Sequence, residues 1–184
     1  KSADMTNILK SKRTITKTEY PELITKCFPM PTLHKLEALK LSCNEVKDQK
    51  IRNFVWFIIT SILRSTSPVG TAQWQYIQPN KSKTKVVDPY VAYTDKLSEI
   101  ITDMHSLQDV FGRNAHAKVL LEDARDIKSI PEKWADMVIT SPPYANNYDY
   151  ADAMRLEMLF WDDINGWKDL QDKVSINLVR ACTQ

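Results

Sequence analysis

A short apolar run that ends in two prolines constrains the fold of this chain more than any other feature. Residues 137–140 are Met-Val-Ile-Thr, and Ser141, Pro142, Pro143 and Tyr144 follow directly. Such a run is typical of a short buried strand. Proline fixes φ and removes the backbone N–H, so a Pro-Pro pair stiffens the loop and lets nearby carbonyls point outward. Because ligands bind at the carboxyl ends of strands in open α/β sheets, the run predicts an exposed ligand-binding loop.

A second apolar run lies upstream. Residues 117–121, Ala-Lys-Val-Leu-Leu, are followed by the acidic residues Glu122 and Asp123. A short helix is expected next, and Trp134 then leads into the run at 137–140. The order is strand, acidic turn, short helix, strand and Ser-Pro-Pro-Tyr, which predicts a pair of strands in an α/β sheet.

In this context, residues 140–144 (Thr-Ser-Pro-Pro-Tyr) resemble the catalytic motif of the DNA amino-methyltransferases. These enzymes transfer a methyl group from S-adenosylmethionine to a base nitrogen. The resemblance covers roughly residues 116–165 and implies a partial Rossmann-like methyltransferase fold, with S-adenosylmethionine as cofactor and DNA as partner. Serine at the first motif position is more similar to the cytosine-N4 enzymes of restriction–modification systems than to the adenine-N6 enzymes.

The resemblance assigns catalytic roles to Ser141, Pro142, Pro143 and Tyr144. The Ser141 hydroxyl and the Pro142 carbonyl would accept hydrogen bonds from the exocyclic amine, whose lone pair is otherwise delocalised into the ring. Tyr144 would stack on the base. Positioning and oriented dipoles would then supply most of the catalysis. A base inside a duplex cannot reach such a loop, so the target is expected to be flipped out or single-stranded.

Other residues of the site follow from the same resemblance. Asp123 is the best match to the acidic residue that contacts the adenine of the cofactor, although it and Asp126 equally fit simple helix caps. Asn146 and Tyr148 are expected to line the mouth of the pocket as base or backbone contacts. Downstream, Asp149 is expected to cap a helix whose Arg155 and Glu157 form either pocket residues or, as we favour, an ordinary exposed pair, and residues 167–182 are expected to form a packing helix.

The cofactor site is incomplete in this sequence. The family binds the methionine and ribose parts of its cofactor with a Phe-x-Gly-x-Gly turn, whereas the three glycines here, Gly70, Gly112 and Gly166, are far apart. The chain also opens without a methionine. We therefore expect a further segment to carry the glycine-rich turn. The permuted motif order of the family allows either side of the present piece, and we favour the upstream side. The present piece is expected to be inactive alone.

Residues 1–110 are expected to form a mainly helical region before the motif strands, and residues 111–184 a partial Rossmann-like catalytic region. Apolar spacings of three and four predict three helices in this region. One begins at a cap on Thr32, one covers residues 45–64, and one runs from a cap on Thr94 to an end near Gly112.

Residues 65–90 form the second candidate site, a DNA-contacting loop. Residues 65–83 are expected to be irregular, and their amide, aromatic and basic side chains suit base edges, unpaired bases and phosphates. The candidate DNA-binding residues are Gln73, Trp74, Lys81 and Lys83. The same residues also fit a surface loop anchored by Trp74, with its lysines merely solvated.

Composition excludes several classes of function. The chain is 43% hydrophobic, enough for a core, and its net charge of +2 gives no global electrostatic case for nucleic acid. Its three cysteines lack paired spacing, which suits reduced thiols in the cytoplasm, and they lack both the close pairs of a zinc site and the Pro-Cys nucleophile of cytosine-C5 methyltransferases. The longest apolar stretch, residues 54–59, is too short to span a membrane. Neither metal nor membrane is therefore expected as a partner.

Three alternatives to cytosine-N4 methylation stay open. An adenine-N6 enzyme would carry the same loop. A non-catalytic DNA-binding remnant would explain the missing glycine-rich turn. Methylation of nitrogen in RNA or protein is the third alternative, because one loop does not define the polymer.

Overall fold

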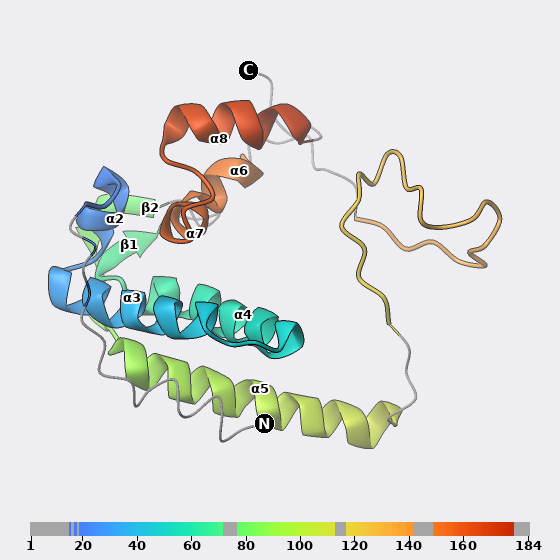
Figure 1. The fold of residues 1–184 in the computed structure, drawn as a ribbon, viewed down its shortest axis with the longest axis horizontal. Helices are drawn as coiled ribbons and strands as arrows, with labels where there is room; N and C mark the ends of the chain where they lie inside the picture. Colours follow the sequence, from blue (N-terminus) through green and yellow to red (C-terminus); the bar gives the residue numbers. More distant parts are fainter. Residues whose placement is uncertain are drawn as a thin grey trace.

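The computed structural model describes residues 15, 17, 19–71, 77–112, 117–141 and 149–178. These residues form helices and one small antiparallel sheet, a mixed architecture that is compatible with the α/β class (Figure 1). The elements run α2 (Glu22–Cys27), α3 (Met30–Asn44), α4 (Gln49–Thr66), β1 (Val69–Thr71), β2 (Ile77–Ser82), α5 (Pro89–Phe111), α6 (Tyr150–Ala153), α7 (Arg155–Phe160), α8 (Trp167–Lys173) and a 3₁₀ turn (Ser175–Asn177).

The helices α3, α4 and α5 form the main body of the molecule. Helix α4 lies against both α3 and α5, and Figure 1 shows the three as neighbouring layers. Their facing sides supply most of one continuous hydrophobic core, whose fully buried members include Leu33, Leu36, Leu39, Ile58, Ile59, Ile62 and Tyr93. Helices lie before residue 111 as expected. Apolar spacing predicted the buried face of α4, whereas Met104 and Leu107, which share the predicted apolar face of α5, are 47% and 56% exposed.

Aspartates, not threonines, start the two longest helices. The Asp48 carboxylate accepts hydrogen bonds from the backbone N–H groups of residues 50 and 51, at 2.8 and 3.2 Å, and Asp88 caps α5 in the same way. The cap predicted at Thr94 is wrong, because Thr94 lies inside α5 and its hydroxyl donates to the carbonyl of Tyr90 at 2.9 Å. Aspartate followed by proline is the stronger start signal, since Pro89 fits the first helical turn.

Two further helix limits can be compared with the sequence. The cap predicted at Thr32 is also wrong, because α3 begins at Met30 and Pro29 precedes it without a side-chain cap. The end predicted near Gly112 is confirmed: this residue follows α5 with φ of 70°, a conformation that favours glycine. Proline ahead of an apolar helix is therefore an earlier start signal here than a threonine inside it.

Residues expected to be irregular contain an antiparallel hairpin. Strand β1 pairs with β2 in the register Val69–Ser82, Gly70–Gln78 and Thr71–Ile77, with a bulge after Val69. At Gly70 an added Cβ would lie 2.9 Å from the Cβ of Lys81, so glycine permits the close approach of the strands. The prediction of an irregular loop over 65–83 was wrong for the described part of the range. Strand β2 was not predicted because it contains Pro79, and proline within a run argues against a strand. Proline is nevertheless tolerated in an edge strand.

The C-terminal helices fold back onto the N-terminal ones. Helix α7 packs on α2, and Leu156, Phe160 and Leu170 join the common core. The cap predicted at Asp149 is confirmed, since its carboxylate accepts from the backbone N–H groups of residues 151 and 152. The helix expected over 167–182 ends sooner, at Lys173, and residues 179–182 lie outside the described residues.

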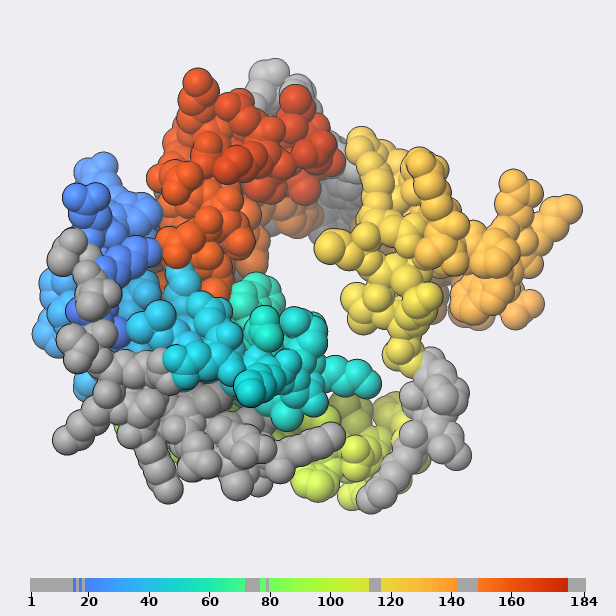
Figure 2. Space-filling view, in the orientation of Figure 1, coloured from blue at the N-terminus to red at the C-terminus, as the bar shows by residue number. Residues whose placement is uncertain are grey.

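The segment 117–141 contains neither of the two expected strands. It follows an extended course with turns in place of the expected short helix, and Val119, Leu121 and Ile139 are 97%, 103% and 88% exposed. Figure 1 and Figure 2 show it projecting on the side of the molecule opposite α2. A buried parallel strand takes backbone hydrogen bonds from neighbours and needs cover on both faces. The described residues supply no such neighbour to either apolar run, which explains why neither run forms a strand there.

No helix in the described part of the chain is long and apolar enough to cross a bilayer. The same part contains no group of three or more histidine, cysteine, aspartate or glutamate side chains that could hold a metal ion.

Candidate functional site

The structure describes four of the predicted site residues: Asp123, Ser141, Lys81 and Lys83. The remaining predicted residues lie outside the described residues, and they are Gln73, Trp74, Pro142, Pro143, Tyr144, Asn146 and Tyr148. The geometry of the site is therefore built from the acidic turn, the end of the motif run, the hairpin and the helices that follow residue 148.

Asp123 is held in a local turn by Arg125. The Asp123 carboxylate accepts from the Arg125 backbone N–H at 2.9 Å, and the guanidinium binds both carboxylate oxygens, with Nη2–Oδ2 at 2.6 Å. These hydrogen bonds from Arg125 lower the pKa of Asp123 to about 2. The carboxylate is therefore ionised at neutral pH and acts only as an acceptor. Because both side chains are exposed to solvent, the pair holds a turn without contributing much to global stability.

A second carboxylate closes the same turn. Glu122 accepts from the backbone N–H groups of Lys128 and Ser129, at 2.8 and 3.1 Å, and hydrogen bonds from Ser129 are the main cause of its lowered pKa. With Asp123 and Asp126, these residues line a shallow, open depression. The helix-capping role that the sequence left open for Asp123 is not seen, because no helix follows it within the described segment 117–141; its carboxylate caps a turn instead. Its carboxylate lone pairs also suit an amino group that approaches from solvent.

Ser141 lies at the end of the exposed run 137–141 and is itself exposed. It lies outside the depression lined by Glu122 and Asp123. The described residues therefore do not bring Ser141 and Asp123 into one pocket. Both groups are nevertheless open to solvent on the same projecting segment.

The two hairpin lysines have different surroundings. Lys81 is exposed on β2, where a phosphate has access to it. The Lys83 ammonium instead donates to the backbone carbonyl of Arg64 at 2.7 Å, near the end of α4. Partial burial, followed by the charge of Arg64, lowers the pKa of Lys83. Lys83 therefore acts structurally at a helix C-terminus, and its contact with DNA stays a prediction.

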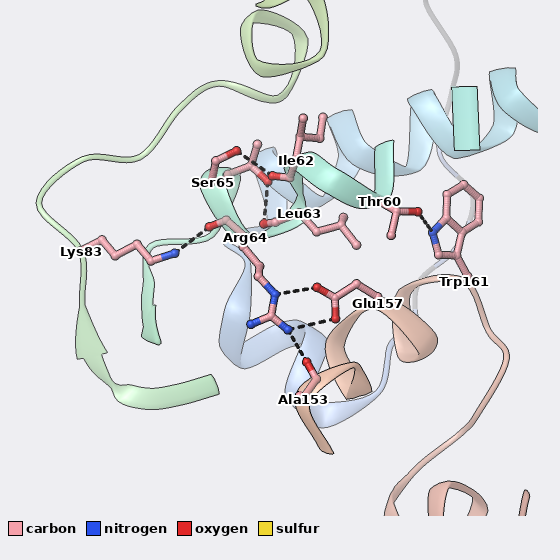
Figure 3. Close-up of polar contacts among 10 residues, drawn as sticks. Thr60, Ile62, Leu63, Arg64, Ser65, Lys83, Ala153, Glu157 and Trp161 are labelled. Atoms are coloured by element: carbon pink, nitrogen blue, oxygen red, sulfur yellow. Dashed lines mark hydrogen bonds and ion pairs between the residues drawn. The ribbon is translucent and has the colours of Figure 1, made fainter. Parts of the chain in front are cut away.

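Sequence analysis missed the most buried ion pair that borders the motif. Arg64 of α4 binds Glu157 of α7 through both carboxylate oxygens, with Nε–Oε1 at 2.7 Å and Nη2–Oε2 at 3.1 Å (Figure 3). The two side chains are only 19% and 9% exposed. Nη2 of Arg64 also donates to the carbonyl of Ala153 in α6. Arg64 therefore joins α4 to the two helices that directly follow residues 142–148.

The expected exposed pair of Arg155 and Glu157 does not form. Arg155 pairs with Asp152 at 3.1 Å and lies over the ring of Trp167, whereas Glu157 is buried against Arg64. Residues two apart in a helix point in different directions, so the spacing alone argued against the pair. A carboxylate at 157 between the apolar residues 156 and 159 was the available signal that it faced the core.

Comparisons with protein-family models, with curated proteins and with solved structures found no match. The function is therefore inferred from the motif and from the contacts described above.

Proposed function

We propose that this chain takes part in site-specific methylation of DNA on the exocyclic N4 amine of cytosine, as in a restriction–modification system. The observation that carries the proposal is residues 140–144, Thr-Ser-Pro-Pro-Tyr, placed directly after an apolar run and an upstream acidic turn. In the complete site, the runs 117–121 and 137–140 would pair as strands of a Rossmann-like sheet. Ser141 and Tyr144 would then lie at its carboxyl edge, where ligands bind.

In this mechanism the loop works by positioning. The Ser141 hydroxyl oxygen and the Pro142 carbonyl accept hydrogen bonds from the two N–H groups of the amine. These hydrogen bonds draw the nitrogen lone pair out of conjugation with the ring. Pro143 stiffens the loop, and Tyr144 stacks on the extruded base. S-adenosylmethionine supplies an electrophilic methyl group. The Ser141 hydroxyl and the Pro142 carbonyl would hold the amine in line with that methyl group, and the proton that the amine loses on methylation would pass to water.

The acidic turn supports a partial fit for the cofactor. Asp123 is ionised, exposed and acceptor-only, which suits the amino group of an adenine ring. Gly70, Gly112 and Gly166 form no Gly-x-Gly turn, so residues outside this sequence would hold the methionine and ribose parts. The proposal therefore applies to the full-length protein.

The decisive experiment measures methyl transfer by the full-length protein from labelled S-adenosylmethionine to DNA. The double variant Ser141→Ala, Tyr144→Ala is expected to lose transfer, because it removes one acceptor and the stacking ring. Ser106→Ala, on the exposed side of α5, serves as the matched serine control. Unchanged transfer by the double variant removes the roles assigned to both residues.

The product identifies the base. Digestion of the methylated DNA to nucleosides, followed by mass spectrometry, is expected to give N4-methylcytosine. N6-methyladenine would establish the adenine alternative, which uses the same loop. Transfer to RNA or protein but not to DNA would establish the third alternative.

A non-catalytic DNA-binding remnant is the second candidate, and the separated glycines favour it. Calorimetry of the full-length protein with S-adenosylmethionine distinguishes the two candidates. The enzyme is expected to bind the cofactor, whereas a remnant binds DNA alone. The present piece is expected to bind cofactor weakly or not at all, and micromolar binding by it would show that the cofactor site is complete without the missing turn.

A further inference from the structure

We propose that Arg64 is a positioning residue that couples the basic hairpin β1–β2 to the helices that follow the motif loop. This inference rests on the proposed function, because it assigns Arg64 to the placement of α6 and α7, the helices that follow the motif in the sequence. It concerns a residue that neither the motif nor the hairpin contains. Four hydrogen bonds of Arg64 carry it, and Figure 3 shows them together.

Arg64 is the point where three segments meet. Lys83, the residue directly after β2, donates a hydrogen bond to the Arg64 backbone carbonyl at 2.7 Å. From the Arg64 side chain, the guanidinium reaches Glu157 of α7 and the carbonyl of Ala153 in α6. Side chain and main chain of one residue therefore bridge the hairpin to α6 and α7.

The position of Ala153 gives this bridge its consequence. Helix α6 begins at Tyr150 with Asp149 as its cap, and Ala151 and Ala153 are buried in the packed body. Holding the Ala153 carbonyl fixes α6, the first described helix after the motif in sequence, relative to α4. A displacement of about 1 Å at a reacting group costs on the order of 10²-fold in rate, so this anchor bears on turnover.

The guanidinium is suited to this task in a way that an ammonium is not. Its planar fork binds both oxygens of Glu157 and still offers a donor to Ala153. Lysine would keep the positive charge but lose the bidentate geometry. Because the guanidinium is largely buried and held by protein acceptors, Arg64 acts through Ala153 and Glu157, not through contact with DNA.

Trp161 provides a reporter of the same helix contact that is independent of activity. Its indole Nε1–H donates to the Thr60 hydroxyl at 2.8 Å (Figure 3). Thr60 lies one turn before Arg64 on α4, and Trp161 lies one turn after Glu157. The indole N–H resonance of Trp161, assigned with Trp161→Phe, therefore reports how α7 is seated on α4.

The experiment compares Arg64→Lys with Arg52→Lys in the full-length protein. Arg52 is on the same helix and donates to the carbonyl of Val46, far in sequence from the motif. Arg64→Lys is expected to lower kcat on the order of 10²-fold, with the Kd and KM for DNA unchanged and the Trp161 resonance shifted. Arg52→Lys is expected to leave all four quantities unchanged.

Several results would overturn the inference. They are an unchanged kcat in Arg64→Lys, a parallel loss of kcat and DNA affinity, or a loss of kcat that only follows the fraction of folded protein. The first denies a positioning role, the second indicates direct DNA contact, and the third indicates a purely structural role.

A double-mutant comparison separates this inference from the proposed function. Lys83→Met is expected to shift the Trp161 resonance in the wild-type background but not in Arg64→Lys, because Arg64 carries the coupling. If the wild-type protein transfers no methyl group yet this pattern appears, the proposed function fails and the coupling stands. If the Lys83→Met shift is equal in both backgrounds, the coupling fails whatever the activity.

Discussion

The packed helices and the segment 117–141 contain similar apolar residues and use them differently. Leu33 of α3 is 0% exposed, whereas Leu121 is 103% exposed. A helix satisfies its own backbone hydrogen bonds and needs a partner for one face only. An extended run needs neighbours for its backbone and for both faces. The comparison shows that, within the described residues, the buried apolar side chains come mainly from helices, whereas the apolar side chains of the extended segment stay exposed.

The two regions also contain the same kind of ion pair, with different expected effects on the stability of the fold. Arg64–Glu157 and Arg125–Asp123 are both bidentate arginine–carboxylate pairs. The first is largely buried between helices, and the second is exposed between residues two apart in sequence. Burial raises the penalty for removing one partner, because the other charge stays desolvated. Only the first pair should therefore contribute to the stability of the whole fold.

Arginine removal gives the largest expected difference between the regions. Arg64→Met is expected to lower the free energy of unfolding by about 3–5 kcal/mol, because Glu157 is left buried and unpaired. The matched variant Arg125→Met is expected to leave the urea midpoint unchanged. Urea titration followed by circular dichroism measures both, and equal shifts would show that burial does not separate the two pairs.

Leucine truncation tests the same comparison on the apolar side. Leu33→Ala is expected to cost about 2–5 kcal/mol through lost burial and a residual cavity. Leu121→Ala deletes the same atoms at a site that is exposed to solvent. Its free energy of unfolding is expected to stay within about 0.5 kcal/mol of the parent value. The same titration measures both free energies of unfolding. A large cost at Leu121 would mean that the segment packs against the body in solution.

This contrast also explains what the sequence could predict. The apolar face of α4, the cap at Asp149 and the end at Gly112 depend on residues within one turn, so spacing and capping rules found them. Whether the runs 117–121 and 137–140 form strands depends on pairing partners, which an apolar run does not identify, and the described residues pair neither run. The Arg64–Glu157 pair joins residues 93 positions apart, and no local pattern relates them.

Alkaline pH should weaken the packed region through its buried thiols. Burial raises the pKa of the Cys27 and Cys43 thiols from the ordinary value of about 9 to about 11. Unfolded thiols therefore ionise first, so this stabilisation is present below pH 9 and is lost as the pH rises towards 11. In a Cys182→Ser background, the free energy of unfolding is expected to fall over this interval, and both thiols should react slowly at pH 8 until the protein unfolds. Fast reaction of the Cys27 and Cys43 thiols in the native protein would contradict their burial in the packed region.

A capping aspartate gives the smallest and most discriminating effect. Asp48 and Asp123 each accept a backbone N–H two residues later, at 2.8 and 2.9 Å, so their local chemistry is the same. Asp48 starts the 18-residue helix α4, whose buried face joins the core, whereas Asp123 closes an exposed turn. Asp48→Ala is therefore expected to cost about 1 kcal/mol of global stability, and Asp123→Ala to leave the unfolding curve unchanged. If Asp123→Ala instead lowers the affinity of the full-length protein for S-adenosylmethionine, its carboxylate serves a ligand and not the fold.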